Sequence, residues 1–145
     1  MTKSILIAID LTADASWKHA LPKAVELARF YKAELHVTYV LPDVGSKLVA
    51  DFFPPDFHRK AIARAQAELE ALTAAQIPAD VTVKLHLRHG EVHDEVLSVI
   101  GESGADLVIM ASHAPDNVRE FLVGSQADRL VRRSPVSVLV VRSQS

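Results

Sequence analysis

The stretch Ile5-Leu6-Ile7-Ala8-Ile9-Asp10 decides the fold. Five apolar residues follow one another without a polar position, and a carboxylate then ends the run. An amphipathic helix would place polar residues at a period of about 3.6, whereas a short, uniformly apolar run is typical of a strand covered on both faces. Residues 107–111, Leu-Val-Ile-Met-Ala, have the same character. We therefore predict that these two runs are the central strands of a parallel sheet.

Three further strands are predicted at residues 35–41, 81–87 and 136–141, and amphipathic helices separate the strands. The apolar positions of the four helical stripes are Trp17, Leu21, Val25 and Ala28; Ile62, Ala65, Leu69 and Leu72; Val92, Val96, Leu97 and Ile100; and Ala127, Leu130 and Val131. Strands that alternate with helices form a parallel sheet with right-handed crossovers. The prediction is an α/β fold, a Rossmann-like three-layer sandwich whose five-stranded parallel sheet has the order 3-2-1-4-5. Residues 1–145 are expected to form a single domain.

The two predicted edge strands differ in how they avoid stray pairing. The strand at 81–87 alternates strictly and has basic side chains at or beside it, namely Lys84, His86 and Arg88. The strand at 136–141 has neither a charge nor an internal proline, so its edge would be unprotected. We expect two chains to pair there as a homodimer, through the edge formed by Val136, Val138 and Val140. The alternative is that the C-terminal residues or a loop cover this edge.

Composition excludes several classes of function. A net charge of −2 and a pI near 6.4 give no electrostatic footprint for nucleic acid or for an anionic membrane surface. No run approaches the roughly 18 apolar residues of a spanning helix, so we expect no membrane insertion. The apolar run at the start is too short for a secretory leader, which favours a cytoplasmic protein. The absence of cysteine excludes disulfides, thiolate nucleophiles and cysteine-based zinc sites.

The seven histidines invite a comparison with metal sites. The densest group is His86, His89 and His93, with Glu91 and Asp94 nearby. Its spacing matches no known ligand pattern, because a strand end, a turn and a helix start would have to converge. We expect no metal site.

The expected ligand site lies where the winding of the sheet reverses, between the strands at 5–9 and 107–111. Ligands of open parallel sheets bind there, beyond the carboxyl ends of the strands. Asp10 leaves the first strand, and Gly124-Ser125 begins a helix across the crevice. Free N–H groups at a helix N-terminus favour phosphate, and a carboxylate accepts hydrogen bonds from ribose or base. This pattern favours a nucleotide site. The alternative is that Asp10 caps a turn and Gly-Ser only caps a helix.

The same residues resemble the universal stress protein family. The resemblance rests on Met110-Ala111-Ser112-His113-Ala114, nine further residues, Gly124-Ser125 and the run from Arg132 to Arg142. The opening run to Asp10 and Arg88-His89-Gly90 also match, so the likeness covers the whole chain. Nucleotide-binding members carry Gly-x2-Gly-x9-Gly-Ser/Thr, which corresponds here to Ala111, Ala114, Gly124 and Ser125. Alanine at a position with positive φ costs about 1 kcal/mol or more, and at negative φ the change is nearly silent. A short bacterial branch with Ala-Ser-His-x-Pro, similar to this sequence, includes nucleotide binders.

The resemblance implies a HUP-type fold that binds ATP or AMP, with or without Mg²⁺. By position, the adenine and ribose end would be lined by Ala8, Asp10 and Val40. The residues under the ribose and phosphates would be Met110, Ala111, Ser112, His113 and Ala114. The phosphates would be held by Gly124, Ser125, Gln126 and Ala127. Arg119 would either reach a terminal phosphate or remain an exposed loop arginine.

No set of residues forms a convincing catalytic centre. The chain lacks the Gly-x4-Gly-Lys-Ser/Thr loop of P-loop NTPases and the Gly-x-Ser-x-Gly elbow of hydrolases. Cleavage of a phosphoanhydride needs a metal, a positioned nucleophile and charge stabilisation, and only Asp10 and Arg119 offer themselves. We expect a stress-response protein that binds ATP or AMP as a regulatory ligand and acts on an unidentified protein partner. The alternative is a nucleotide-independent dimeric interaction module, and a weak ATPase is a third possibility.

Overall fold

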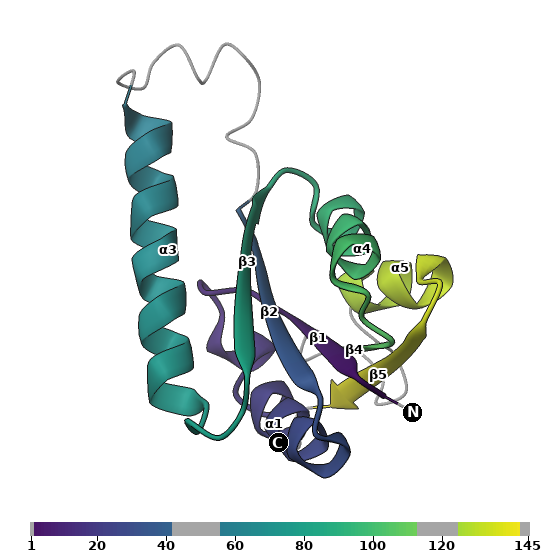
Figure 1. Cartoon of the computed structure of the whole chain (residues 1–145). Helices are drawn as coiled ribbons and strands as arrows, with labels where there is room; N and C mark the ends of the chain where they lie inside the picture. Colours follow the sequence, from purple (N-terminus) through teal and green to yellow (C-terminus); the bar gives the residue numbers. More distant parts are fainter. Residues whose placement is uncertain (1, 42–55, 113–124, 143–145) are drawn as a thin grey trace.

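A computed structural model describes residues 2–41, 56–112 and 125–142, which form a five-stranded parallel sheet with helices on both faces (Figure 1). The strands are β1 (Ser4–Ile9), β2 (Glu34–Leu41), β3 (Val83–His89), β4 (Leu107–Ser112) and β5 (Ser137–Arg142). The helices are η1 (Asp14–Ser16, a 3₁₀ turn), α1 (Ala20–Tyr31), α3 (Phe57–Gln76), α4 (Val92–Ser103) and α5 (Ser125–Arg133). The strand order is β3-β2-β1-β4-β5, which confirms the predicted topology.

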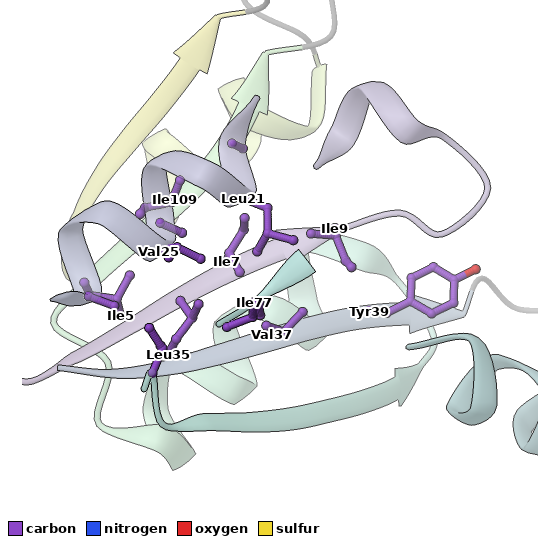
Figure 2. Close-up of a cluster of buried hydrophobic side chains, with 14 of the residues drawn as sticks. Ile5, Ile7, Ile9, Leu21, Val25, Leu35, Val37, Tyr39, Ile77 and Ile109 are labelled. Carbon is purple, nitrogen blue, oxygen red and sulfur yellow. The ribbon is translucent and has the colours of Figure 1, made fainter. Parts of the chain in front are cut away.

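Two apolar cores lie on opposite faces of the sheet. On one face, α1 and α3 pack over alternate residues of the strands, and Figure 2 shows Leu21 and Val25 of α1 against Ile5 and Ile7 of β1. On the other face, α4 and α5 cover Leu6, Ala8 and Val108. Every residue from Ile5 to Ile9 is buried, as expected for a strand covered on both sides. The uniformly apolar run that the sequence shows is therefore explained by the two cores.

The first helix begins later than its apolar stripe predicted. Trp17 was expected inside the helix, but it follows η1, and α1 starts only at Ala20. Pro22 is the third residue of α1, where the missing N–H would have no partner within the helix. The proline is thus tolerated in the first turn.

The helices α1 and α4 each end at a residue in the left-handed conformation. Gly104 follows α4 with φ 68° and ends the helix. Lys32 follows α1 with φ 55° and ψ 43°, and it is the only non-glycine residue of the described ranges with positive φ. A lysine at this position carries a strain that glycine would not.

The edge strands are close to their predicted places. The strand predicted at 81–87 runs from Val83 to His89, two residues later, and pairs with β2 along seven residues. The other edge, β5, pairs with β4 on one side, and its four central residues are half-buried. On its outer side β5 has no strand neighbour among the described residues. Among the described residues, β5 is therefore an edge strand of half-buried apolar side chains, as predicted.

Candidate functional site

A pocket of about 270 Å³ lies at the carboxyl ends of β1, β2 and β4, at the predicted reversal of the sheet. Its walls come from these strands, from η1 and from the starts of α4 and α5. The described lining residues are Ala8, Ile9, Asp10, Thr12, Ser16, Thr38, Tyr39, Val40, Val92, Val96, Met110, Ala111, Gln126 and Ala127. The volume is close to the lower end, about 300 Å³, of pockets that hold drug-sized ligands.

A hydrogen-bonded turn fixes Asp10 at one end of the pocket. The carboxylate oxygen Oδ1 accepts hydrogen bonds from the N–H of Thr12 at 2.9 Å and from its hydroxyl at 2.6 Å. The buried hydroxyl of Ser16 accepts the Asp10 N–H at 2.8 Å, and it lies 2.9 Å from the Asp10 carbonyl oxygen. The side chain of Asp10 is exposed. The turn thus presents a carboxylate of fixed orientation to whatever occupies the pocket.

Tyr39 brings a second titratable group to this end of the pocket. Burial raises the pKa of its phenol, and the negative charges of Asp10 and Glu68 raise it further. The phenol is therefore neutral at physiological pH and can serve as a hydrogen-bond donor.

Two polar atoms among the lining residues are buried without a hydrogen-bond partner. They are Oγ1 of Thr38, whose residue is fully buried, and Oε1 of Gln126. Burying a hydroxyl or an amide oxygen without a partner costs free energy, so such atoms call for an explanation. Both lie at the wall of one pocket, where a ligand with hydrogen-bond donors would satisfy them.

The first turn of α5 also lines the pocket. The helix begins at Ser125, and Gln126 and Ala127 of its first turn line the pocket. The first N–H groups of a helix have no partner within it and favour an anion. Of the described lining residues, Asp10 alone carries a charge, so an anion here would depend on these N–H groups for its stabilisation.

The structure brings together seven of the residues predicted from the sequence. They are Ala8, Asp10, Val40, Met110, Ala111, Gln126 and Ala127. Ser112 is buried at the end of β4 and does not line the pocket. Ser125 starts α5, as expected. The predicted residues His113, Ala114, Arg119 and Gly124 lie outside the described residues.

Ala111 is one of the two alanines that stand where nucleotide-binding family members carry glycine. It lies within β4 and has negative φ, because Lys32 is the only non-glycine residue of the described ranges with positive φ. A glycine is therefore not required by the backbone at this position.

Seven lining residues were not predicted from the sequence. They are Ile9, Thr12, Ser16, Thr38, Tyr39, Val92 and Val96. Thr38 and Tyr39 lie in register with Ala8 and Ile9, so they follow once the pairing of β2 with β1 is known. Val92 and Val96 had been recognised only as positions of a helical stripe.

Two features are absent from the described parts of the chain. No group of three histidine or acidic side chains there is arranged to hold a metal ion. Among the described helices, none combines the length and the apolar character needed to cross a bilayer.

Comparison with known proteins gives the same family at the levels of sequence and fold. Residues 1–142 match the model of the universal stress protein family. Universal stress protein G of Shigella flexneri is 30% identical over 148 residues, covering 98% of this chain and 100% of that protein. Universal stress protein MJ0577 of Methanocaldococcus jannaschii is 26% identical over 163 residues, covering 100% of this chain and 98% of that protein.

Solved structures show the same fold. The structure of MJ0577 superposes with a TM-score of 0.74 at 25% identity, covering 100% of this chain and 99% of that one. A universal stress protein solved in complex with cAMP has a TM-score of 0.62 at 20% identity, covering 99% and 98% of the two chains. With the family model matched from residue 1 to residue 142, this chain belongs to the universal stress protein family.

Proposed function

We propose that the pocket binds an adenine nucleotide, ATP or AMP, as a regulatory ligand of a cytoplasmic stress response. The observation that carries this proposal is the pocket at the sheet reversal, which is lined both by the Asp10 carboxylate and by the first turn of α5. A nucleotide has hydroxyl donors at its sugar, which suit a carboxylate, and negative charge at its phosphates, which suits the N–H groups of a helix N-terminus.

The apolar walls suit the base. Val40 of β2, Val92 and Val96 of α4 and Met110 of β4 offer apolar surface to a flat ring. The ribose hydroxyls would donate to Asp10, whose carboxylate is already oriented by Thr12. The partnerless oxygens of Thr38 and Gln126 would accept from the exocyclic amine or a sugar hydroxyl. The phosphates would lie against the N–H groups of α5, with or without Mg²⁺.

The role proposed for the nucleotide is regulatory, not catalytic. Phosphoanhydride cleavage needs a positioned nucleophile and charge stabilisation, and Asp10 is the single charged residue among the described lining residues. Occupancy would change the surface near the pocket for an unidentified protein partner.

We also propose that the protein is a homodimer paired through β5. The support is the half-buried outer edge of this strand, which carries Val138 and Val140 in the middle of the strand and ends at Arg142. An apolar edge of this kind is an aggregation hazard unless a second strand covers it.

The test of nucleotide binding is calorimetric titration of the purified protein with ATP, AMP and cAMP, with GTP for comparison. We expect submillimolar binding of adenine nucleotides. Gln126→Glu keeps the side-chain shape but places a negative charge beside the phosphates, and it should abolish binding. Asp10→Asn should weaken it. Ala71→Glu introduces the same charge on an exposed position of α3, which does not line the pocket, and should bind as the wild type does.

Absence of heat with every nucleotide, in the wild type and in all variants, would reject the proposal in favour of the nucleotide-independent interaction module. Hydrolysis of labelled ATP that survives removal of contaminating ATPases and disappears in Asp10→Asn would instead make the protein an enzyme.

A further inference from the structure

A strip of polar side chains crosses the sheet face that α4 covers. Glu34, His36 and Thr38 alternate along β2, and the register pairs His36 with Lys84 and Thr38 with His86 on β3. Next to this strip the same face is apolar, formed by Leu6, Ala8 and Val108 of β1 and β4. The strip leads from the outer start of β2 to Thr38 at the pocket. A polar strip inside a core is costly unless its members bond to one another.

His36 and His86 form the centre of this strip. Nδ1 of His36 lies 2.8 Å from Nε2 of His86, and the two rings stack with centroids 5.0 Å apart and planes inclined by 28°. Only 3% of His36 is exposed. At this distance one ring nitrogen must carry a hydrogen and the other must offer its lone pair. The contact therefore exists when the pair is neutral or singly protonated, and it is lost when both facing nitrogens carry hydrogens.

Charged groups surround the pair on each packed element. On β2, Oε2 of Glu34 lies 3.4 Å from Nε2 of His36, an electrostatic contact longer than a good hydrogen bond. On β3, Lys84 reaches the other oxygen of Glu34 at 3.4 Å, and Arg88 forms an ion pair with Glu102 of α4. The charge of Glu34 favours a hydrogen on Nε2 of His36, although Nε2 makes no hydrogen bond among the described residues. This leaves Nδ1 as the acceptor, so in the neutral pair Nε2 of His86 donates to Nδ1 of His36.

The surroundings make protonation unfavourable for both rings. Burial lowers the pKa of His36, opposed by the charge of Glu34 and assisted by that of Lys84. Burial also lowers the pKa of His86, and the neighbouring His36 and Arg88 lower it further. Two imidazolium ions facing each other at this distance would repel each other, with little solvent to screen them.

We propose that the His36–His86 pair is an acid-sensitive latch, which fastens the edge strand β3 to β2 at neutral pH and opens when both rings are protonated. The strand β3 is the element that opening would release, because it is an edge strand and β2 is its only strand neighbour among the described residues. Thr38 stands in register with His86 and lines the pocket, so release of β3 would remove support from the pocket wall. This last consequence rests on the proposed nucleotide site, whereas the latch itself does not.

The direction of the pH dependence follows from the lowered pKa values. In the unfolded chain the two histidines take up protons near their ordinary pKa of 6.5, whereas in the folded protein their pKa values are lower and they stay neutral to a lower pH. The pair's contribution to stability is therefore complete above this value and is lost as the pH falls from it toward the lowered pKa of the folded pair. Each proton bound only by the unfolded chain reduces the folding equilibrium constant by up to about tenfold per pH unit.

The test compares urea unfolding at a series of pH values between 7.5 and 5 for the wild type, His86→Gln and His19→Gln, without nucleotide. Glutamine at 86 keeps a donor for Nδ1 of His36 but takes up no proton, so the fall in folding constant should be shallower, by up to about tenfold per pH unit. His19 is exposed, and its replacement should leave the pH dependence of the folding equilibrium constant as it is in the wild type. The same dependence in His86→Gln as in the wild type would overturn the proposal.

A second measurement uses the unaltered protein, so it does not depend on a variant that folds. Imidazole ¹⁵N NMR should show a hydrogen shared between Nδ1 of His36 and Nε2 of His86, with both rings titrating below 6.5. Hydrogen exchange at pH 5 should show the amides of β3 losing protection before those of β1. Independent titration of the two rings near 6.5, or simultaneous loss of protection in both strands, would contradict the latch. Loss of nucleotide binding alone at every pH would reject the nucleotide site and leave the latch intact.

Discussion

Thr38 of the pocket carries a buried hydroxyl that lowers the stability of the protein when the pocket is empty. Thr38 is fully buried, yet its hydroxyl has no partner in the structure, whereas the buried Thr73 of α3 donates to the Glu70 carbonyl oxygen at 3.0 Å. Both threonines are buried, Thr38 in a strand and Thr73 in a helix, and they differ in whether the hydroxyl is satisfied. They therefore provide a matched pair for experiment.

We predict that Thr38→Val stabilises the unliganded protein by about 1 kcal/mol, because it removes a buried unsatisfied hydroxyl and keeps the shape of the side chain. Thr73→Val should instead lose up to about 1 kcal/mol, since it removes a made hydrogen bond. Urea denaturation measures both. Equal losses in the two variants would show that Thr38 has a partner in solution. If the hydroxyl contacts nucleotide, Thr38→Val should also weaken the affinity.

We also predict that Asp10→Asn lowers the pKa of Tyr39, because the charge of Asp10 contributes to raising it. The pKa should remain above the ordinary value of 10.0, since burial is the larger cause. Ultraviolet titration of the phenolate measures this, and Tyr39→Phe separates its signal from that of Tyr31. An unchanged titration would mean that solvent screens Asp10 from the ring.

Asp10 and Gln126 of the pocket could be predicted from the sequence, whereas Thr38 could not. Asp10 and Gln126 stand out because each follows or begins a regular element. Thr38 does not, since a single threonine in an apolar strand is ordinary, and its importance depends on its register with Ala8 of β1. The His36–His86 contact was missed for the same reason, because it joins residues 50 positions apart in the sequence.

Element boundaries depend on local backbone conformation, which apolar periodicity does not contain. The stripe that begins at Trp17 has helical spacing, yet the chain forms a 3₁₀ turn before α1 because Ser16 bonds back to Asp10 and Ala13. In contrast, the end of α4 at Gly104 was predictable, since glycine is the residue that most readily adopts positive φ. No such signal marks the end of α1, where Lys32 adopts this conformation.

We predict that Lys32→Gly raises the free energy of unfolding by about 1 kcal/mol, because glycine adopts φ 55° without the clash of a Cβ. Lys32→Ala retains the Cβ and serves as the control, with no comparable gain. Thermal or urea unfolding distinguishes the two. A gain in Lys32→Ala as large as in Lys32→Gly would show that the lysine side chain, rather than the backbone, is responsible.

At the scale of the whole molecule, the strand order was predictable because the pattern of apolar and polar residues in a strand indicates whether one or both of its faces are covered. Unbroken apolar runs belong in the middle, and the alternating strand belongs at an edge, where β3 is found. The open edge at β5 followed from the same reasoning. Which partner pairs with β5 depends on a second molecule, so the pattern of one chain does not determine it.

We predict that Val140→Lys converts the proposed dimer to a monomer or causes precipitation, since it places a charge within the β5 edge. Sedimentation measures the oligomeric state, and circular dichroism shows whether the fold is kept. Ser137→Lys, at the exposed start of the same strand, is the control and should leave the dimer in place. A soluble dimer of unchanged stability in Val140→Lys would mean that the chains associate elsewhere.

The sheet separates two helix layers, and only the layer formed by α4 and α5 supplies helical residues to the pocket. The pocket takes lining residues from α4 and α5, and none of the described residues of α1 or α3 contributes to it. A ligand in the pocket would contact α4 and α5 directly, whereas on the other face it would reach Ile9 and Tyr39 of the core but no residue of α1 or α3 among the described ones. A protein that distinguishes the occupied state from the empty one should therefore approach from the α4–α5 side, and surface substitutions on α1 and α3 should leave that discrimination untouched.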